Sequence, residues 1–422
     1  MIHLENLIIY NIGQLIPLSG PNKLRQGQEM KDVLVIENGY IVIKDGKFID
    51  FGRDKGYQRY LHEDTKLVDA LGCLVTPGLI DSHTHLVHGG SREHEFELKL
   101  RGVPYLEILN QGGGILHTVC ETKKTSFTEL YNKAKKSLDI MLIHGVTTVE
   151  AKSGYGLELD TELKQLKVGH QLNEDHPIDI VQTFMGAHAY PEHFKNNHQA
   201  FIEEIIKMLP EVKEYAEFCD VFCEDGVFSI EESREILEKA KELGFKLKIH
   251  ADEIAPIGGA KLASELGCAS ADHLMASTDE DYRLLASHNI VANVLPATSF
   301  NLNKAYANAR KMIDLGCGLA LSTDYNPGSS PTENLQLVMS LGSIKLKMLP
   351  KEVLTAVTIN AACSLDRAEK IGSIEIGKDA DFVIYNAPNL DYIIYHFGIN
   401  HVKDVYKKGQ LVVNDQKICY GG

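Results

Sequence analysis

The chain lacks tryptophan, has no apolar run long enough to cross a membrane, and has no cysteine spacing typical of a disulfide framework. A transmembrane helix needs about 20 consecutive apolar residues, so we expect no membrane span. The start of the chain has no basic segment ahead of its apolar residues, which makes it a poor signal peptide. The eight cysteines are scattered and mostly lie in apolar runs. We therefore expect reduced, buried thiols in a cytoplasmic protein.

Basic residues are outnumbered by acidic ones. Lys and Arg total 43, Asp and Glu total 58, and the formal net charge is −15. This balance disfavours nucleic acid and anionic membranes as partners, although a pocket with its own cations can still bind a small anion. With 422 residues, of which 44% are hydrophobic, the chain is long enough for one barrel-sized core and an accessory domain.

The centre of the chain alternates short β runs with helical patterns, which is typical of a parallel sheet built from βα units. In the helical segment 230–243, Ser229 is a good N-cap and Gly244 suits the position after the helix end. Eight parallel strands fit an α/β fold of the TIM (β/α)8 barrel type better than an open sheet. The eight runs are 78–85, 146–152, 178–185, 219–224, 246–251, 269–274, 290–295 and 319–324.

The two ends of the chain differ from the centre, because both consist of short β segments separated by turn residues. The pair Asp45-Gly46 between two β segments predicts a hairpin, and residues 374–385 and 402–413 are each hairpin-like. Neither end has enough strands for a stable core of its own. We therefore predict that residues 1–72 and 375–422 form one composite β-sandwich-like domain, and that residues 73–374 form the TIM-barrel domain.

Polar residues gather at the carboxyl-terminal ends of the eight runs, the end at which TIM barrels carry their active sites. His83 and His85 are two apart at the end of the first run, and residues two apart on a strand face the same way. His250 and Asp324 end the fifth and eighth runs. A lone histidine is more often an ordinary hydrogen-bonded residue, but this pattern reverses those odds. Three imidazoles and a carboxylate suit Zn or Fe and disfavour Mg or Ca.

Other polar residues near these strand ends leave alternatives open. His273 is either a further ligand or, as we prefer, a hydrogen-bonding group for the reacting water or an oxyanion. Glu253 is about equally well explained as an active-site carboxylate or as a solvated loop residue. Arg92 is of a type usually found at the surface, but its guanidinium suits a substrate carboxylate. The segment 326–330, Asn-Pro-Gly-Ser-Ser, can bind a carboxylate through backbone N–H groups or serve only as a turn.

These motifs resemble the amidohydrolase superfamily. The resemblance rests on Pro77-Gly-Leu-Ile-Asp-Ser-His-Thr-His85, on His250, His273 and Asp324, and on the segment 377–383, Gly-Lys-Asp-Ala-Asp-Phe-Val. The stretches 88–96, 151–157, 185–189, 250–253 and 322–330 are more specific and are similar to the imidazolonepropionase family within it. The likeness spans nearly the whole chain. It implies a hydrolase that cleaves the cyclic amide C–N bond of 4-imidazolone-5-propanoate to give N-formimidoyl-L-glutamate in histidine degradation.

The resemblance also implies roles for individual residues. It assigns the metal to His83, His85, His250 and Asp324, and substrate contacts to Arg92, Tyr155, His188, Glu253, Asn326, Gly328 and Ser329. Family members with two metals need a carboxylated lysine on the fourth strand, and the run 219–224 has none, which supports one Zn or Fe ion per chain. In the mechanism we expect, Asp324 takes the proton of the attacking water, His273 stabilises the oxyanion and Glu253 holds the ring or the water.

Two alternatives stay open at this point. A ring deaminase or another cyclic amidohydrolase would use the same metal residues, but Arg92 and the segment 326–330 favour an anionic substrate. An inactive scaffold is disfavoured because all four metal residues are present. The sequence leaves open the choice between Zn and Fe, the oligomeric state, a homodimer included, and whether residues 112–114 form a lid.

Overall fold

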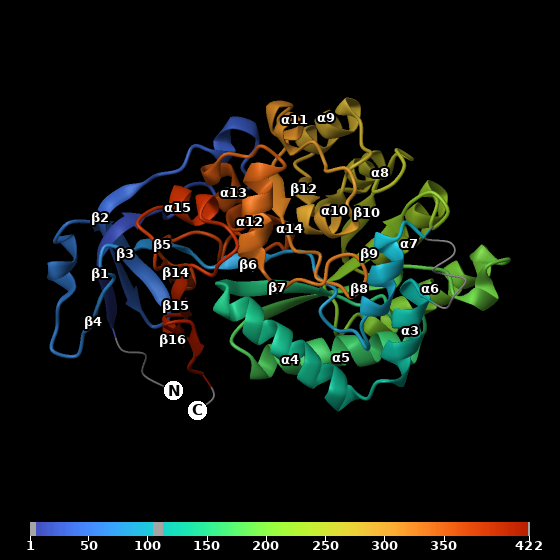
Figure 1. Ribbon diagram of the computed structural model, residues 1–422, viewed down its shortest axis with the longest axis horizontal. Helices are drawn as coiled ribbons and strands as arrows, with labels where there is room; N and C mark the ends of the chain where they lie inside the picture. Colours follow the sequence, from blue (N-terminus) through green and yellow to red (C-terminus); the bar gives the residue numbers. More distant parts are fainter. Residues whose placement is uncertain (1–5, 104–112, 421–422) are drawn as a thin grey trace.

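The computed structural model describes residues 6–103 and 113–420, and in it a parallel barrel lies beside a second sheet (Figure 1). Neighbouring barrel strands follow sequence order and pair in parallel. A parallel bridge between Thr84 and Tyr325 joins the chain after the first strand to the chain after the last, which brings the two sheet edges together. The strands are β6 (Leu79–Asp81), β7 (Val146–Lys152), β8 (Asp179–Ala187), β9 (Phe218–Cys223), β10 (Lys246–Ala251), β11 (Ser270–His273), β12 (Val291–Val294) and β13 (Leu319–Leu321). The predicted barrel is confirmed, and each predicted run overlaps one strand.

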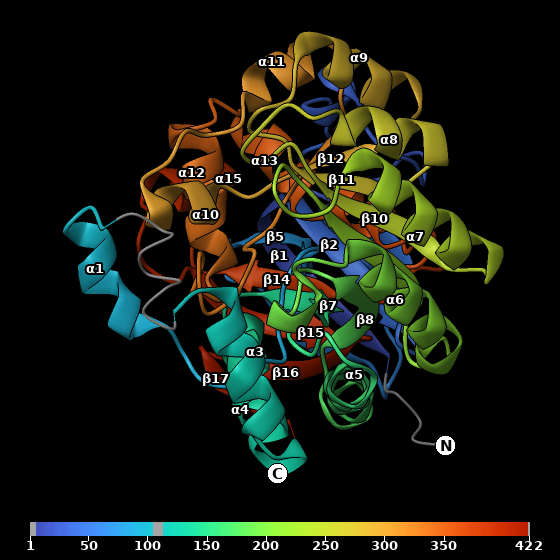
Figure 2. The ribbon, with the colours of Figure 1, turned by 90° about the vertical axis from the view of Figure 1, so that its right-hand side faces the viewer.

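Helices surround the barrel strands (Figure 2). The predicted helix at 230–243 is confirmed as α7 (Ile230–Glu242): the Ser229 side chain accepts the N–H of Glu232, and Gly244 has a φ of +80°. The other helices between barrel strands are α1 (Phe96–Leu100), α3 (Ile115–Lys124), α4 (Phe127–Ile143), α5 (Leu159–Asp175), α6 (His198–Val212), α8 (Gly259–Leu266), α9 (Asp279–Ser287), α10 (Pro296–Leu302) and α11 (Ala309–Asp314). After β13 come α12 (Leu335–Ile344), α13 (Pro350–Ala356), α14 (Ile359–Ser364) and α15 (Leu390–Tyr395).

The second sheet has nine strands from both ends of the chain. They are β1 (Leu7–Leu15), β2 (Ile36–Lys44), β3 (Lys47–Arg53), β4 (Lys66–Asp69), β5 (Leu74–Pro77), β14 (Phe382–Tyr385), β15 (Val402–Lys407), β16 (Gln410–Asn414) and β17 (Lys417–Ile418). The hairpin predicted at Asp45-Gly46 is confirmed, because Lys44 pairs with Lys47 and both turn residues have positive φ. The sheet packs its own apolar cluster, which includes Ile9, Ile41 and Phe382.

The ends of the chain differ from the sequence interpretation in two ways. Residues 374–385 contain one strand, β14, and not a hairpin, because β14 takes its hydrogen-bonding partners from β5 and β15. Strand β5 follows residue 72 in the chain, yet it pairs with β1 and β14 and so belongs to the second sheet. We keep the division into residues 1–72 with 375–422 and residues 73–374 as a proposal, in which β5 of the second part adds a strand to the second sheet.

Two further sequence expectations concern membranes and thiols. Among residues 6–103 and 113–420, no helix combines the length and apolar character that a membrane crossing requires. All eight cysteines are free, and five of them are buried. Cys120 and Cys419 are exposed.

Candidate metal centre

Three imidazoles converge at the carboxyl-terminal ends of β6 and β10. One nitrogen from each of His83, His85 and His250 lies within 4.8 Å of the others, and each residue is at most 3% exposed. Asp324 Oδ1 lies 3.5 Å from His83 Nε2 and 3.8 Å from His85 Nε2. The structure thus brings together the four residues to which the sequence assigns a metal.

The hydrogen bonding of the imidazoles fits a metal ion. The Nε2 atoms of His83 and His250 are buried and have no hydrogen-bond partner in the described part of the chain, which is rare for buried polar atoms. The opposite nitrogens have partners: His83 Nδ1 lies 2.5 Å from Asp272 Oδ2, and His250 Nδ1 lies 3.1 Å from Asp220 Oδ1. When Nδ1–H donates to a carboxylate, Nε2 keeps its lone pair for a metal. The donor set and its surroundings therefore suit an ion such as Zn or Fe.

Burial controls the charge of these imidazoles. Burial, together with the charge of Lys152, holds the pKa of His83 well below its ordinary value, and burial has the same effect on the pKa of His85. Burial also lowers the pKa of His250, but the neighbouring Asp220 carboxylate outweighs it and the net shift is upward. The neutral imidazole is the form that binds metals, so His83 and His85 are prepared to act as ligands.

Asp324 follows the end of β13 in a strained backbone conformation, with a φ of +53°. Its N–H donates to the carbonyl of His83 at 3.0 Å, and Thr298 Oγ1 donates to its Oδ2 at 2.5 Å. Burial raises the pKa of Asp324, while His273 and the Thr298 hydroxyl act in the opposite direction. Thr298 was not predictable from the sequence, because it lies on α10 and no spacing pattern relates it to the strand ends.

His273 lies beside the three clustered imidazoles. Its ring centroid is 5.1 Å from that of His250 and 5.6 Å from that of His83, and its Nε2 is 3.8 Å from Glu253 Oε2. Its φ of +77° is a second strained position at a strand end. His273 and Glu253 thus lie together beside the clustered imidazoles.

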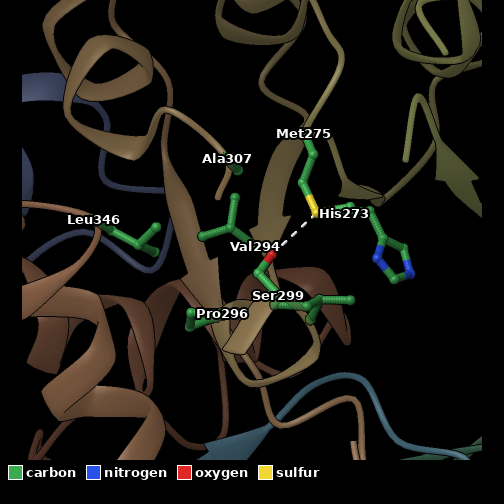
Figure 3. Close-up of a pocket in the computed structure, with 8 residues that line it drawn as sticks. His273, Met275, Val294, Pro296, Ser299, Ala307 and Leu346 are labelled. Carbon is green, nitrogen blue, oxygen red and sulfur yellow. Dashed lines mark hydrogen bonds between the residues drawn. The ribbon is translucent and has the colours of Figure 1, made fainter. Parts of the chain in front are cut away.

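A small cavity adjoins His273. Figure 3 shows the imidazole at one side of this cavity and Ser299 directed at Met275, with Oγ 3.2 Å from Sδ. The cavity is too small to hold a water molecule, and its other lining residues are Val294, Leu295, Pro296, Ala307 and Leu346. An apolar wall strengthens the electrostatic interactions of the polar groups beside it.

Aromatic residues form another side of the centre. The His188 ring stacks on that of His85 with centroids 4.8 Å apart and 12° between the planes, and the Tyr155 ring is 5.5 Å from that of His85. His188 Nδ1–H donates to the Gly154 carbonyl at 3.0 Å. Gly154 has a φ of +101°, and a Cβ there would lie 2.8 Å from His188 Nδ1. A glycine is therefore required for His188 to approach this closely.

Arg92 belongs to what we call the arginine cluster: Arg92, Glu95, Lys99, Gly114 and Gly328. Arg92 Nε and Nη2 donate to the two carboxylate oxygens of Glu95 at 2.8 and 2.9 Å. Lys99 Nζ lies 3.2 Å from Glu95 Oε2 and donates to the Gly328 carbonyl at 3.0 Å. A Cβ on Gly328 would lie 2.1 Å from Arg92 Nη1. One edge of the guanidinium thus contacts Glu95, while Nη1 lies against the backbone of Gly328.

Glu95 is also held by the backbone of Gly114, whose N–H donates to Oε1 at 2.6 Å. Burial tends to raise the pKa of Glu95, but Arg92 and this N–H outweigh burial and lower it to about 2. Of the segment 112–114 considered as a lid, residue 112 lies outside the described residues. Gly114 itself precedes α3 and ties that helix to Glu95.

The segment 326–330 is held together by Asn326. Its Oδ1 accepts the N–H groups of Gly328 and Ser329 at 2.8 and 2.7 Å. Its Nδ2 donates to the carbonyl of Asp324 at 2.6 Å. These two backbone N–H groups are therefore paired within the loop, and a carboxylate bound to them would have to replace the Asn326 contact.

Five charged residues inside the barrel, to which the sequence assigned no role, form what we call the buried charge cluster: Glu150, Lys152, Asp220, Lys248 and Asp272. A signal was present, because these residues interrupt apolar strand runs. The carboxylates of Asp220 and Asp272 are the partners of the His250 and His83 rings described above.

Comparison with known proteins places the chain in a family. Residues 74–412 match the model of the amidohydrolase family. The chain is 58% identical over 410 residues to a protein of Fusobacterium nucleatum named imidazolonepropionase, covering 96% of this chain and 98% of that protein. It is 56% identical over 410 residues to the imidazolonepropionase of Alkaliphilus oremlandii, covering 96% and 97%.

Solved structures with the same fold are more distant in sequence. An adenosine deaminase of Xanthomonas campestris with bound zinc superposes with a TM-score of 0.74 at 16% identity, covering 99% of this chain and 94% of that one. The guanine deaminase of E. coli superposes with a TM-score of 0.70 at 16% identity, covering 97% and 99%. These similarities show the fold alone.

Proposed function

The chain belongs to the amidohydrolase family and, within it, to the imidazolonepropionases, and we propose on this premise that it hydrolyses 4-imidazolone-5-propanoate to N-formimidoyl-L-glutamate in histidine degradation. The observation that carries the proposal is the 54–58% identity to imidazolonepropionases over nearly the full length of both chains. The convergence of His83, His85, His250 and Asp324 at one end of the barrel agrees with it.

We propose that these four residues hold one Zn or Fe ion per chain. The support is the pair of buried Nε2 atoms on His83 and His250 and the carboxylate beside them. When bound, such an ion activates a water molecule and polarises the carbonyl of the substrate ring.

Asp324 is the proposed proton carrier. Overall, water adds its oxygen to the ring carbonyl carbon, the amide C–N bond breaks, and the nitrogen gains the proton. Asp324 takes the proton from the attacking water and returns it to the leaving nitrogen. This role is supported by the position of Oδ1 beside the imidazole Nε2 atoms and by the Thr298 hydroxyl, which holds Oδ2.

The surrounding side chains bind and orient the ring. His273 donates a hydrogen bond to the oxyanion that forms at the carbonyl, and Glu253 holds the ring or the attacking water. Tyr155 and His188 lie against the imidazole of His85 and form the wall on which the substrate ring packs.

Arg92 anchors the propionate, with Asn326, Gly328 and Ser329 as the adjoining part of this subsite. The contact of Arg92 Nη1 with the backbone of Gly328 supports this placement. Anchoring the carboxylate fixes the orientation of the ring at the metal centre. We further propose a cytoplasmic enzyme, which the buried free thiols support.

The test is incubation of the metal-loaded protein with 4-imidazolone-5-propanoate, followed by mass spectrometry. We expect the product to have gained one water and to carry an N-formimidoyl group. Adenine and guanine serve as comparison substrates, because ammonia release from either would indicate a ring deaminase. If the metal-loaded protein does not hydrolyse 4-imidazolone-5-propanoate, the proposed function is rejected.

A further inference from the structure

The buried charge cluster lies inside the barrel, behind the imidazoles of the metal centre. Its members are Glu150 and Lys152 on β7, Asp220 on β9, Lys248 on β10 and Asp272 on β11, and each is at most 1% exposed. Three carboxylates thus share the interior with two ammonium groups. Buried charges are very unfavourable unless they are paired, so their mutual contacts determine how each side chain is oriented.

Lys152 stands at the centre of these contacts. Its Nζ donates to Asp220 Oδ2 at 2.7 Å and to Glu150 Oε1 at 3.0 Å, and lies 3.7 Å from Asp272 Oδ2. Asp220 and Asp272 are the two carboxylates that accept from His250 Nδ1 and His83 Nδ1. One ammonium group therefore contacts both carboxylates that orient the metal-binding imidazoles.

We propose that Lys152 is a positioning residue for the metal centre. It holds the carboxylates of Asp220 and Asp272 in place, and these in turn fix the rings of His250 and His83 with Nδ1–H donating and Nε2 directed at the metal. Partners of metal-bound imidazoles generally fix the tautomer and orientation of the ring. The inference rests on the metal residues of the proposed function and does not depend on which substrate is hydrolysed.

Lys248 offers a matched control. It is equally buried and belongs to the same cluster, but its Nζ contacts Glu150 Oε1 at 3.1 Å and the Ser82 carbonyl at 3.3 Å. Replacing Lys248 removes a buried ammonium without removing a direct contact to Asp220, and Lys248 lowers the pKa of Asp272 less strongly than Lys152 does. A purely structural effect should therefore appear equally in variants of both lysines, and a positioning effect should be clearly larger in variants of Lys152.

His83, Glu150 and Asp272 also meet the distance requirement for a metal group. The ammonium groups of Lys152 and Lys248 lie 3.0 and 3.1 Å from Glu150 Oε1. Cations of the protein already neutralise these carboxylates, so we assign this group to the buried charge cluster and not to a second metal.

The experiment compares Lys152→Met and Lys248→Met in the full-length chain. Zinc affinity is measured by competition with a chromophoric chelator, and the stability of the metal-free proteins by denaturant unfolding. We expect both variants to lose stability, Lys152→Met to lose roughly 10–100-fold in zinc affinity, and Lys248→Met to stay within about threefold of the parent. Unchanged affinity in Lys152→Met, or an equal loss in Lys248→Met, would overturn the proposal.

Asp220→Asn and Asp272→Asn provide the second test if Lys152→Met does not fold. Both changes keep the size of the side chain and remove the charge through which Lys152 is proposed to act. We expect each to weaken zinc binding about tenfold or more, and wild-type affinity in both would overturn the proposal. Zinc binding by the parent protein without turnover of 4-imidazolone-5-propanoate would reject the proposed reaction and leave this comparison of affinities valid.

Discussion

The buried charge cluster and the arginine cluster both pair carboxylates with cations, but they do so in different parts of the barrel. Glu150, Lys152 and their partners lie on strands, with side chains that are 0% exposed. Arg92 and Lys99 lie in the segment after β6, where their side chains are 9% and 25% exposed. The first cluster is held by the register of neighbouring strands, and the second by a loop and a short helix.

This difference matches what we propose that each cluster positions, metal ligands in the first case and a substrate carboxylate in the second. Metal ligands must be held within a few tenths of an ångström, and sites built on strands are more precise than sites built on loops. A substrate carboxylate enters and leaves, so its partners must be reachable from solvent. We therefore expect changes at the strand ends to affect chemistry and metal binding, and changes in the arginine cluster to affect substrate binding.

The largest expected effect is loss of the metal. Dialysis against a strong chelator should abolish turnover, and one equivalent of Zn or Fe should restore it, because the ion supplies the activation of water. Elemental analysis of the purified protein should give about one metal per chain, as expected for a single set of four metal residues. Two metals per chain would contradict the single-ion proposal.

The next largest effect is expected for Asp324→Asn. The amide cannot accept the proton of water at neutral pH, and loss of a general base typically costs about 10²–10⁴-fold in rate. Circular dichroism should show the parent fold, and elemental analysis should report the bound metal. Thr298→Val is the matched control, because it removes only the hydroxyl that holds Oδ2 and should cost less. Activity within tenfold of the parent, with metal bound, would remove Asp324 from this role.

Arg92→Met tests the arginine cluster directly. A charge-assisted hydrogen bond is worth roughly 1.5–3 kcal/mol, so kcat/KM should fall about tenfold to a few hundredfold. The change should appear mainly in KM if the contact is equally strong in the ground and transition states. For a substrate analogue that lacks the propionate, kcat/KM should fall little further when Arg92 is replaced by Met. If the variant still discriminates against that analogue as strongly as the parent does, Arg92 does not bind the carboxylate.

Glu95→Gln should have a smaller effect. Glu95 orients Arg92 through two hydrogen bonds, and a glutamine can keep only one acceptor oxygen. Loss of one hydrogen bond that orients Arg92 costs about 1 kcal/mol. This corresponds to an increase in KM of roughly fivefold, with kcat and metal content unchanged. A larger fall in kcat than rise in KM would place Glu95 in the chemistry instead.

The smallest expected effect concerns the dependence of folding stability on pH. The folded-state pKa of Glu95 is lowered to about 2, so its ionised form stabilises the fold at pH values above the ordinary value of 4.5. That contribution decreases as the pH falls below 4.5 and is gone below the folded-state value. We expect the stability difference between the parent and Glu95→Gln, measured by denaturant unfolding, to narrow on acidification from neutral pH. A stability difference that grows on acidification would contradict the lowered pKa of Glu95.

Elements defined by short-range patterns were predictable. The barrel strands follow from apolar runs, α7 from its cap residues Ser229 and Gly244, and the β2–β3 hairpin from Asp45-Gly46. Each of these depends on residues close together in the chain. The pairing of β14 with β5 was not predictable, because an apolar strand has many acceptable partners and only the assembled sheet selects among them.

The features of the site likewise divide into those that the sequence could predict and those that it could not. The sequence could place His83, His85, His250 and Asp324 at strand ends, since the carboxyl-terminal ends of parallel strands meet on one side of a barrel. It could not show that Asn326 pairs the backbone N–H groups of its own loop. Nor could it show that Arg92 donates to both carboxylate oxygens of Glu95.

By itself the sequence determined which residue types stand at the strand ends, and therefore that a metal centre of imidazoles and a carboxylate was the chemistry to expect. It also placed Lys152, Asp220 and Asp272 within apolar strands, where charges need partners. Only the tertiary structure decided which partners they have. Strands β7, β9 and β11 are not hydrogen-bonded neighbours in the barrel, so the contacts of Lys152 with Asp220 and Asp272 arise from closure of the barrel, which brings inward-facing side chains of separate strands into one layer.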